Sequence, residues 1–140
     1  NPNSHRSWNG IAIIHCFMGN TEAAIRAAER AIALSPHNPA IWFAYWAMAE
    51  AHLQEMQHEQ AVDFARKSLQ HDENARPVYH ILAAASAHLG RMDDARRAID
   101  TALAFDPGLT ISRFREIYPV AQHKNLDSYM DGLRKAGMPE

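Results

Sequence analysis

Apolar residues recur every three to four positions along most of the chain, the period of a helix with one buried face. Breaks with Gly, Pro or Asn separate these stretches, as in "FMGNTEAA" and "LSPHNPAIW". The pattern predicts helices over 4–18, 21–34, 39–55, 58–71, 75–89 and 92–105. Residues with side-chain oxygens that could cap helix starts are Asn3 or Ser4, Thr21, Asn38 and Asn74. The sequence therefore predicts an all-α fold.

Two segments repeat the same pattern at a distance. "GNTEAAIRAAERAIALSP" (19–36) and "GRMDDARRAIDTALAFDP" (90–107) both open on Gly and close on Pro, with Ala five positions after the Gly. Ala61 and Ala95 are 34 residues apart, whereas Ala24 and Ala61 are 37 apart, so three residues are extra between the first two copies.

Aligning the aromatic positions gives three repeats in the first 109 residues. They span 5–38, 42–75 and 76–109, with the three-residue insertion at 39–41. We expect the insertion to add nearly one turn to the third helix. Residues 110–140 follow as a separate C-terminal segment.

The pattern resembles the tetratricopeptide repeat, a helix-turn-helix of 34 residues. The matching residues are the aromatic at the fourth position (Trp8, Tyr45, Tyr79), small residues at the eighth (Ala12, Ala49, Ala83) and twentieth (Ala24, Ala61, Ala95), and closing prolines (Pro36, Pro107). The resemblance implies a right-handed superhelical stack of three repeats. The middle repeat departs from the pattern, because Met56 stands where a turn glycine is expected. A left-handed Met56 would be strained by about 1 kcal/mol.

The last thirty residues have a different pattern. Ile111, Phe114, Ile117 and Tyr118 share one helical face until Pro119, and a second helix carries Leu126, Tyr129, Met130 and Leu133. We expect these helices to cover the apolar end of the third repeat. The alternative is that the tail docks on another protein or on a second copy of the chain.

The tail also resembles the C-terminus of bacterial multidomain regulators. "DPGLTISRFREIYP", "YMDGLRKAGMPE" and "AHLGRMDDAR" are similar to phrases found where tetratricopeptide repeats follow a class III adenylate or guanylate cyclase domain. A similar tail occurs behind winged-helix DNA-binding domains of transcriptional regulators. Either resemblance implies that the chain is a fragment of a longer cytoplasmic signalling protein.

Composition narrows the function classes. A chain of 140 residues with 47% hydrophobic content suits one globular domain or a short repeat array. The net charge of -2 gives no field that favours nucleic acid or an anionic membrane. Apolar runs are too short to span a bilayer. The single cysteine, Cys16, allows no internal disulfide.

No catalytic or metal motif is present. His80 and His88 are two helical turns apart, but the chain has no H-E-x-x-H motif, nucleotide-binding loop or nucleophile elbow. His15 and Cys16 are neighbours on a helix and point about 100° apart. We therefore expect no enzyme activity, no cofactor and no metal. The rival hypothesis is that the fragment contributes directly to the output of a cyclase.

The resemblance also implies a binding groove lined by the first helix of each repeat. The family's groove positions, carried over one by one, hold Arg6, Asn9, Ile13, Phe17, Phe43, Trp46, Glu50, His80, Ala84 and His88. Exposed aromatics such as Phe17 and Trp46 suit an apolar helix or extended peptide. We expect a protein or peptide partner, including upstream domains of the same protein, and leave homodimerisation open. The alternative is that the chain's own tail fills this groove.

Overall fold

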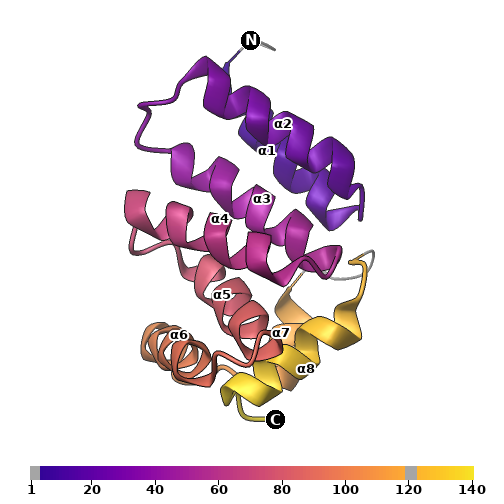
Figure 1. Cartoon of the computed structure of the whole chain (residues 1–140), viewed down its shortest axis with the longest axis vertical. Helices are drawn as coiled ribbons and strands as arrows, with labels where there is room; N and C mark the ends of the chain where they lie inside the picture. The colour runs from indigo at the N-terminus through magenta and orange to yellow at the C-terminus, as the bar shows by residue number, and fades with distance from the viewer. Residues whose placement is uncertain (1–3, 119–122) are drawn as a thin grey trace.

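The computed structural model describes residues 4–118 and 123–140. Within these ranges the chain forms eight α-helices and no strand, as expected for an all-α repeat protein (Figure 1). The first six are α1 (His5–Phe17), α2 (Thr21–Leu34), α3 (Ile41–Gln54), α4 (His58–His71), α5 (Arg76–His88) and α6 (Met92–Phe105). The tail forms α7 (Ile111–Ile117) and α8 (Leu126–Ala136).

The six predicted helices are confirmed, with one correction. The second helix of each pair has the predicted bounds, and α1 and α5 are one residue shorter at each end. The expectation that the insertion adds nearly one turn to the third helix is wrong, because α3 has 14 residues, only one more than α1 and α5. The other two extra residues lie in the connection 35–40, which has six residues where the connection 72–75 has four. There Asn38 Oδ1 accepts from the Ala40 N–H at 2.8 Å, which closes a turn ahead of the helix.

The predicted caps were partly right. Ser4 caps α1, since its side chain accepts from the Ser7 N–H at 3.2 Å. The residues before α2, α3 and α5 are Asn20, Ala40 and Ala75, and none makes a side-chain cap bond. The predictions for Thr21, Asn38 and Asn74 were therefore wrong. Asn3 and Pro119 lie outside the described residues.

The same turn joins the two helices of each pair. Gly19, Met56 and Gly90 all have left-handed backbones, with φ of 75°, 59° and 76°. The next amide bonds back to the carbonyl five residues earlier in each turn, as in Gln57 N–H to His52 O at 2.9 Å. The predicted left-handed Met56 is confirmed, so a β-carbon occupies a conformation that glycine adopts at no cost.

Alanine rows hold the stack together. Helices α1 and α2, α3 and α4, and α5 and α6 pack as pairs, and α2 packs on α3 as α4 does on α5 (Figure 1). Ala24, Ala28, Ala61, Ala65 and Ala95 are fully buried at these contacts. Small side chains let helix axes approach closely, so a larger residue in these rows would overpack the core.

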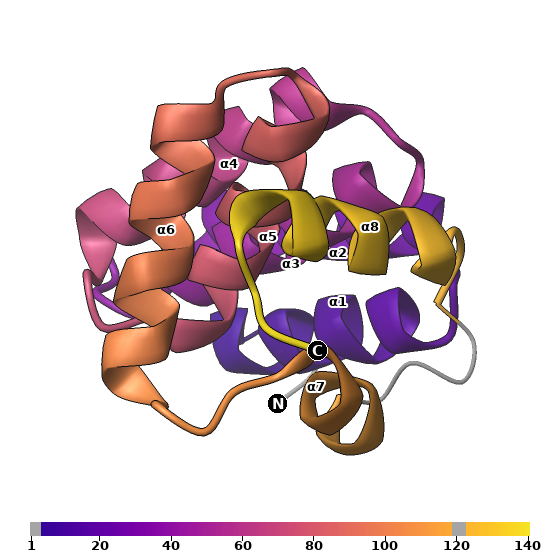
Figure 2. The same cartoon turned by 90° about the horizontal axis from the view of Figure 1, so that it is seen from below.

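The tail returns across the stack. Helix α8 packs along α5 and also contacts α6 and α3 (Figure 2). Its predicted apolar residues Tyr129, Met130 and Leu133 are buried. Helix α7 is covered on one part of its apolar face, where Ile111 and Phe114 are buried. Ile117, expected on the same face, is 62% exposed, so that part of the prediction was wrong.

Candidate binding surface

The residues carried over from the repeat family all lie on α1, α3 and α5, whose shared surface we call the inner surface. Asn9, Ile13, Glu50 and Ala84 are buried, Arg6 is exposed, and Phe17, Phe43, Trp46, His80 and His88 are half-buried. Five of the ten lie against the tail: Phe17, Glu50, His80, Ala84 and His88. The tail, the alternative occupant, therefore fills much of this surface. Binding of a separate partner at these residues stays a prediction.

The aromatic residues of the inner surface divide between tail and core. The Phe17 ring meets the Tyr118 ring edge-on, with centroids 6.0 Å apart. Trp46 stacks on Trp42 at 6.1 Å and meets Phe43 edge-on at 5.0 Å. The buried apolar residues form two core clusters, one within α1, α2 and α3 and the other within α3 to α6 and the tail. Trp46 packs against both clusters. Phe17 thus contributes to tail docking, while Trp46 contributes to the packing of α3.

A buried carboxylate on α3 anchors the tail. Glu50 Oε1 lies 2.9 Å from His123 Nε2, and the two side chains are 0% and 1% exposed. Burial, and next the Glu50 carboxylate, raise the pKa values of the Tyr118 and Tyr129 phenols well above their usual range. Both phenols therefore stay neutral beside Glu50. A buried carboxylate needs such partners, because a charge left alone in the interior is strongly destabilising.

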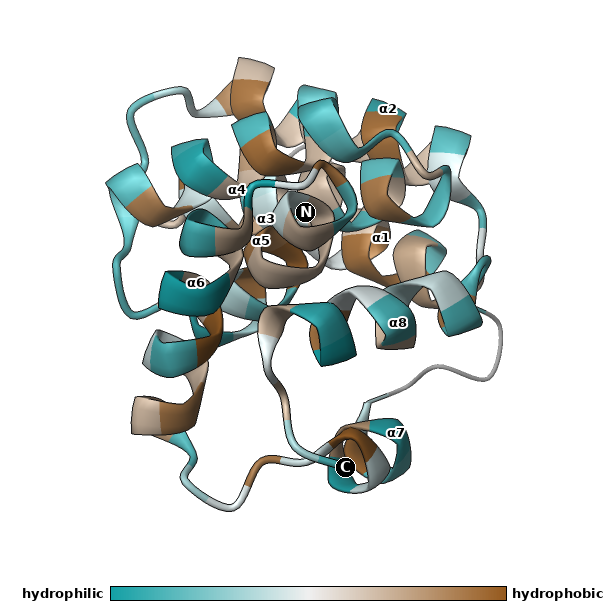
Figure 3. Ribbon diagram, turned by 60° about the horizontal axis from the view of Figure 1, so that its bottom comes forward, coloured by the Kyte–Doolittle hydropathy of each residue, from teal (hydrophilic) through white to brown (hydrophobic). Residues whose placement is uncertain are grey.

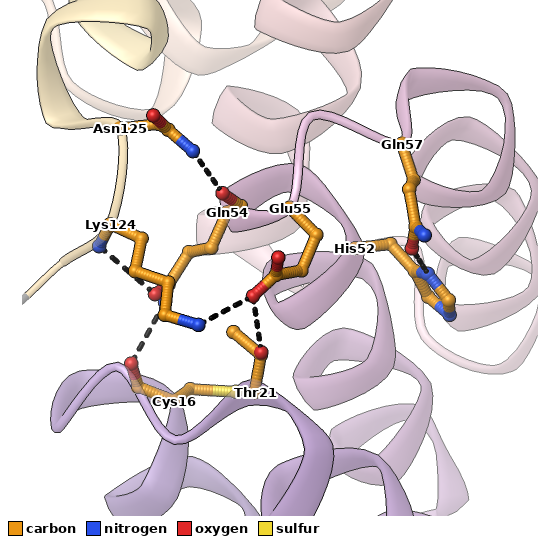
Figure 4. Close-up of polar contacts among 8 residues, drawn as sticks. All are labelled: Cys16, Thr21, His52, Gln54, Glu55, Gln57, Lys124 and Asn125. Carbon is orange, nitrogen blue, oxygen red and sulfur yellow. Dashed lines mark hydrogen bonds and ion pairs between the residues drawn. The ribbon is translucent and has the colours of Figure 1, made fainter.

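The end of α3 makes a second set of polar contacts with the tail (Figure 4). The Gln54 side chain donates to Cys16 O at 2.8 Å and accepts from the Lys124 N–H at 3.2 Å. Asn125 Nδ2 donates to Gln54 O at 2.6 Å. Gln54 is fully buried, so it ties α1, α3 and the tail together at one point.

An ion pair lies beside Gln54 at the surface. Lys124 Nζ is 2.7 Å from Glu55 Oε1, and Thr21 Oγ1 donates to the same oxygen at 2.5 Å (Figure 4). The bond from Lys124, followed by that from Thr21, lowers the pKa of Glu55. Because the Lys124 and Glu55 side chains are 49% and 37% exposed, the ion pair orients the tail more than it stabilises it.

Helix α8 lies close to the backbone of α5 at Gly132. A β-carbon at Gly132 would lie 2.8 Å from Ala84 O and 2.9 Å from Ala84 Cα. Both are backbone atoms, which cannot move aside as a flexible side chain can. Only glycine fits at this crossing while α8 keeps its place on the stack.

The histidines of α5 are packing residues in this arrangement. His80 meets Phe114 edge-on at 5.0 Å, and burial lowers the pKa of His80 to about 4. His88 stacks on His58 at 4.6 Å, and its Nε2 lies 2.6 Å from Ser128 O. Across 4–118 and 123–140, no cluster of three or more His, Cys, Asp or Glu could hold a metal ion.

Cys16 has a structural environment. Its thiol is buried and donates to Ala47 O at 3.2 Å. Burial, with the nearby Glu50 as a smaller cause, raises the pKa of the thiol well above its usual value. Such a thiol is a weak nucleophile at neutral pH.

Sequence reasoning missed most of the tail residues that make these contacts. It also missed Gln54 of α3. Gln54 occupies the same repeat position as Phe17 and His88, so the groove register alone could have identified it. Gly132 stands inside the apolar face of α8, where glycine lowers helix stability and signals a close approach. His123 gave no local signal, because its partner Glu50 is 73 residues away.

Comparison with known families agrees with the repeat architecture. The family model described as anaphase-promoting complex, cyclosome, subunit 3 matches residues 18–102, more than half of the chain. The chain belongs to this family. It is a family of tetratricopeptide-like repeats, so the chain is a tetratricopeptide-type repeat domain. No curated protein matches the chain.

Membership indicates the general role. Tetratricopeptide-like repeats mediate protein–protein interaction, and folds of this kind are typically non-catalytic. In the parts of the chain that the structure describes, no helix has the length and apolar character to cross a membrane.

Proposed function

We propose that this repeat domain binds an amphipathic helix on its inner surface, at the place where α8 lies, and that the partner replaces α8. The observation that carries the proposal is the way α8 is seated. It combines an apolar face, with Tyr129, Met130 and Leu133 buried, and a polar one, and it lies against α5 (Figure 3). A surface that accommodates one amphipathic helix suits another with the same pattern.

A partner that replaces α8 has to reproduce the polar contacts made by the residues just ahead of that helix. Glu50 and Gln54 belong to α3, whereas their partners His123 and Lys124 belong to the tail. A partner helix would need a donor for the Glu50 carboxylate, because that group is fully buried. The surface therefore favours helices with a His, Lys or Arg ahead of an apolar face.

The parent we propose is a bacterial adenylate or guanylate cyclase-like signalling protein, with this domain as its C-terminal contact module. Support comes from the resemblance of "DPGLTISRFREIYP" and "YMDGLRKAGMPE" to the tails of such proteins. The sequence preceding Asn1 tests this assignment: a cyclase domain supports it, and a winged-helix domain replaces it with a transcriptional regulator. Incubation of this domain with ATP or GTP and a divalent metal should give no cyclic nucleotide.

The binding proposal is tested with a peptide of residues 123–140 added in trans. The peptide should bind Gly132→Ala, in which the attached α8 is displaced, with amide shifts on α3 and α5 in NMR spectra. Wild type, with its own α8 in place, should bind at least about tenfold more weakly because the two helices compete. Equal binding to both proteins, or binding to neither, would contradict the proposal.

A further inference from the structure

The first helix of the array leaves uncovered a face that its counterparts bury. Gly10 corresponds in repeat register to Ala47 of α3 and Ile81 of α5, both fully buried. Ile14 corresponds to Ala51 and Ala85, which are also fully buried, yet Ile14 is 58% exposed. Met18, one turn further on, is 50% exposed, and its counterparts Glu55 and Leu89 are exposed and half-buried.

The second helix of the preceding pair covers this face elsewhere in the stack. Ala47 and Ala51 share a core cluster with the alanines of α2, and Ile81 and Ala85 share one with those of α4. The interface between α2 and α3 thus recurs between α4 and α5. The uncovered face of α1 corresponds to the faces of α3 and α5 that α2 and α4 cover. No helix that the structure describes packs against it.

A hollow beside this face is also larger than its counterpart in a pair that another helix covers. The hollow between α1 and α2 has a volume of about 380 Å³ and is lined by residues that include Trp8 and Ile11. Its counterpart between α5 and α6 has about 190 Å³ and is lined by the corresponding Tyr79 and Leu82. The smaller hollow is also lined by Arg66, which comes from the covering helix α4.

Charge on the rim indicates what the occupant carries. In the covered hollow, Asp94 accepts from Arg66 of the covering helix at 3.4 Å. The residue in register with Asp94 is Ala23, so the uncovered hollow lacks that carboxylate. Its rim holds Arg30 where the covered hollow has Thr101, and Arg26, which corresponds to Arg97 and pairs with Glu22 at 3.1 Å. An occupant with carboxylates beside its apolar row would complement these guanidinium groups.

We propose that the face formed by Gly10, Ile14 and Met18, with the adjoining hollow, docks an amphipathic helix of another protein. The helix carries a row of small apolar residues like that of α2, flanked by Asp or Glu. This surface lies on the outer end of the stack, so the inference goes beyond the proposed function and does not depend on it. A second copy of the chain is disfavoured as the occupant, because α6 carries Arg96 where α2 and α4 have Ile25 and Val62.

Two peptides of the length of α2 test the inference. Both are locked as helices by a side-chain crosslink on the outer face and keep the apolar row of residues 24, 25, 28 and 31. One carries Glu at the flanking positions and the other Lys. The Glu peptide should shift the amide signals of α1 and α2 in NMR spectra and bind about tenfold more tightly than the Lys peptide at low salt.

Variants locate the binding surface. Ile14→Asp should weaken binding of the Glu peptide by about tenfold or more, since a charge would enter the contact. Ile117→Asp, at the other exposed isoleucine, should leave it unchanged, and circular dichroism checks that both variants fold. Arg26→Glu with Arg30→Glu should reverse the preference between the peptides.

Three results would overturn the inference. These are absence of binding by either peptide, binding that Ile14→Asp does not weaken, and a wild-type dimer in sedimentation that Ile14→Asp dissociates. The last result would assign the face to a second copy of the chain.

Discussion

Met56→Gly should stabilise the domain, although it removes a large side chain. Met56 is one of three residues that reverse the chain between paired helices, and the other two are Gly19 and Gly90. All three turns make the same pair of backbone hydrogen bonds. The substitution therefore changes the residue without changing the turn that it must form.

The expected gain is the balance of two opposing effects. A left-handed conformation costs a residue with a β-carbon about 1–2 kcal/mol, and glycine avoids this. Glycine offsets about 0.5–1 kcal/mol of this gain, because it gives the unfolded chain greater backbone freedom. The Met56 side chain is half exposed and belongs to neither core cluster, so little packing is lost. The net gain should be about 1 kcal/mol, or about 3 °C in Tm for a chain of this length.

Urea and thermal unfolding followed by circular dichroism measure this gain. The urea m-value should stay unchanged, so that the shift in midpoint reports stability alone. Gly90→Met is the matched control, because a β-carbon at Gly90 meets no atom within 4 Å. It should destabilise the domain by a similar amount. A lower Tm for Met56→Gly, or an unchanged Tm for Gly90→Met, would refute the reasoning.

Three further predictions concern the tail and its contacts. Gly132→Ala should displace α8 and lower Tm, because the new methyl group meets backbone atoms, whereas Gly10→Ala, with no atom within 4 Å, should raise Tm slightly. His123→Ala should reduce the free energy of unfolding by about 3–5 kcal/mol, since it leaves the Glu50 carboxylate buried and unpaired. Adding Glu50→Gln should recover part of this loss in a double-mutant cycle, and purely additive losses would argue against the pair. His80 has a pKa of about 4 when folded, so the unfolded state takes up a proton between about pH 6.5 and pH 4 that the folded state excludes. The free energy of unfolding should decrease as the pH is lowered through that range, by up to about 1.4 kcal/mol per pH unit. In His80→Phe, the urea midpoint should depend less on pH.

Local patterns were sufficient to predict the helices of the stack. The bounds of α2, α4 and α6 were predictable because a left-handed turn residue precedes each one and an alanine row marks its buried face. The start of α3 was not, since the turn at Asn38 competes with an earlier helix start and the connection takes up two of the three inserted residues. A count of extra residues cannot decide between a longer helix and a longer connection.

The inner surface was predictable only as a set of positions. Repeat register placed Glu50, Ala84 and His88 on it, but register says nothing about what covers them. The contacts from Glu50 to His123 and from Ala84 to Gly132 join segments far apart in the chain. Such pairings depend on where α8 docks, which no local periodicity encodes.

Amide hydrogen exchange of α8 tests the central claim most directly, namely that the tail is a replaceable occupant of the inner surface. In wild type, amides of Tyr129, Met130 and Leu133 should be protected. In Gly132→Ala they should lose most of that protection, while α1 and α2 keep theirs because their core cluster contains no residue of α8. Unprotected α8 amides in wild type, or loss of protection throughout α1–α6 in the variant, would contradict the account.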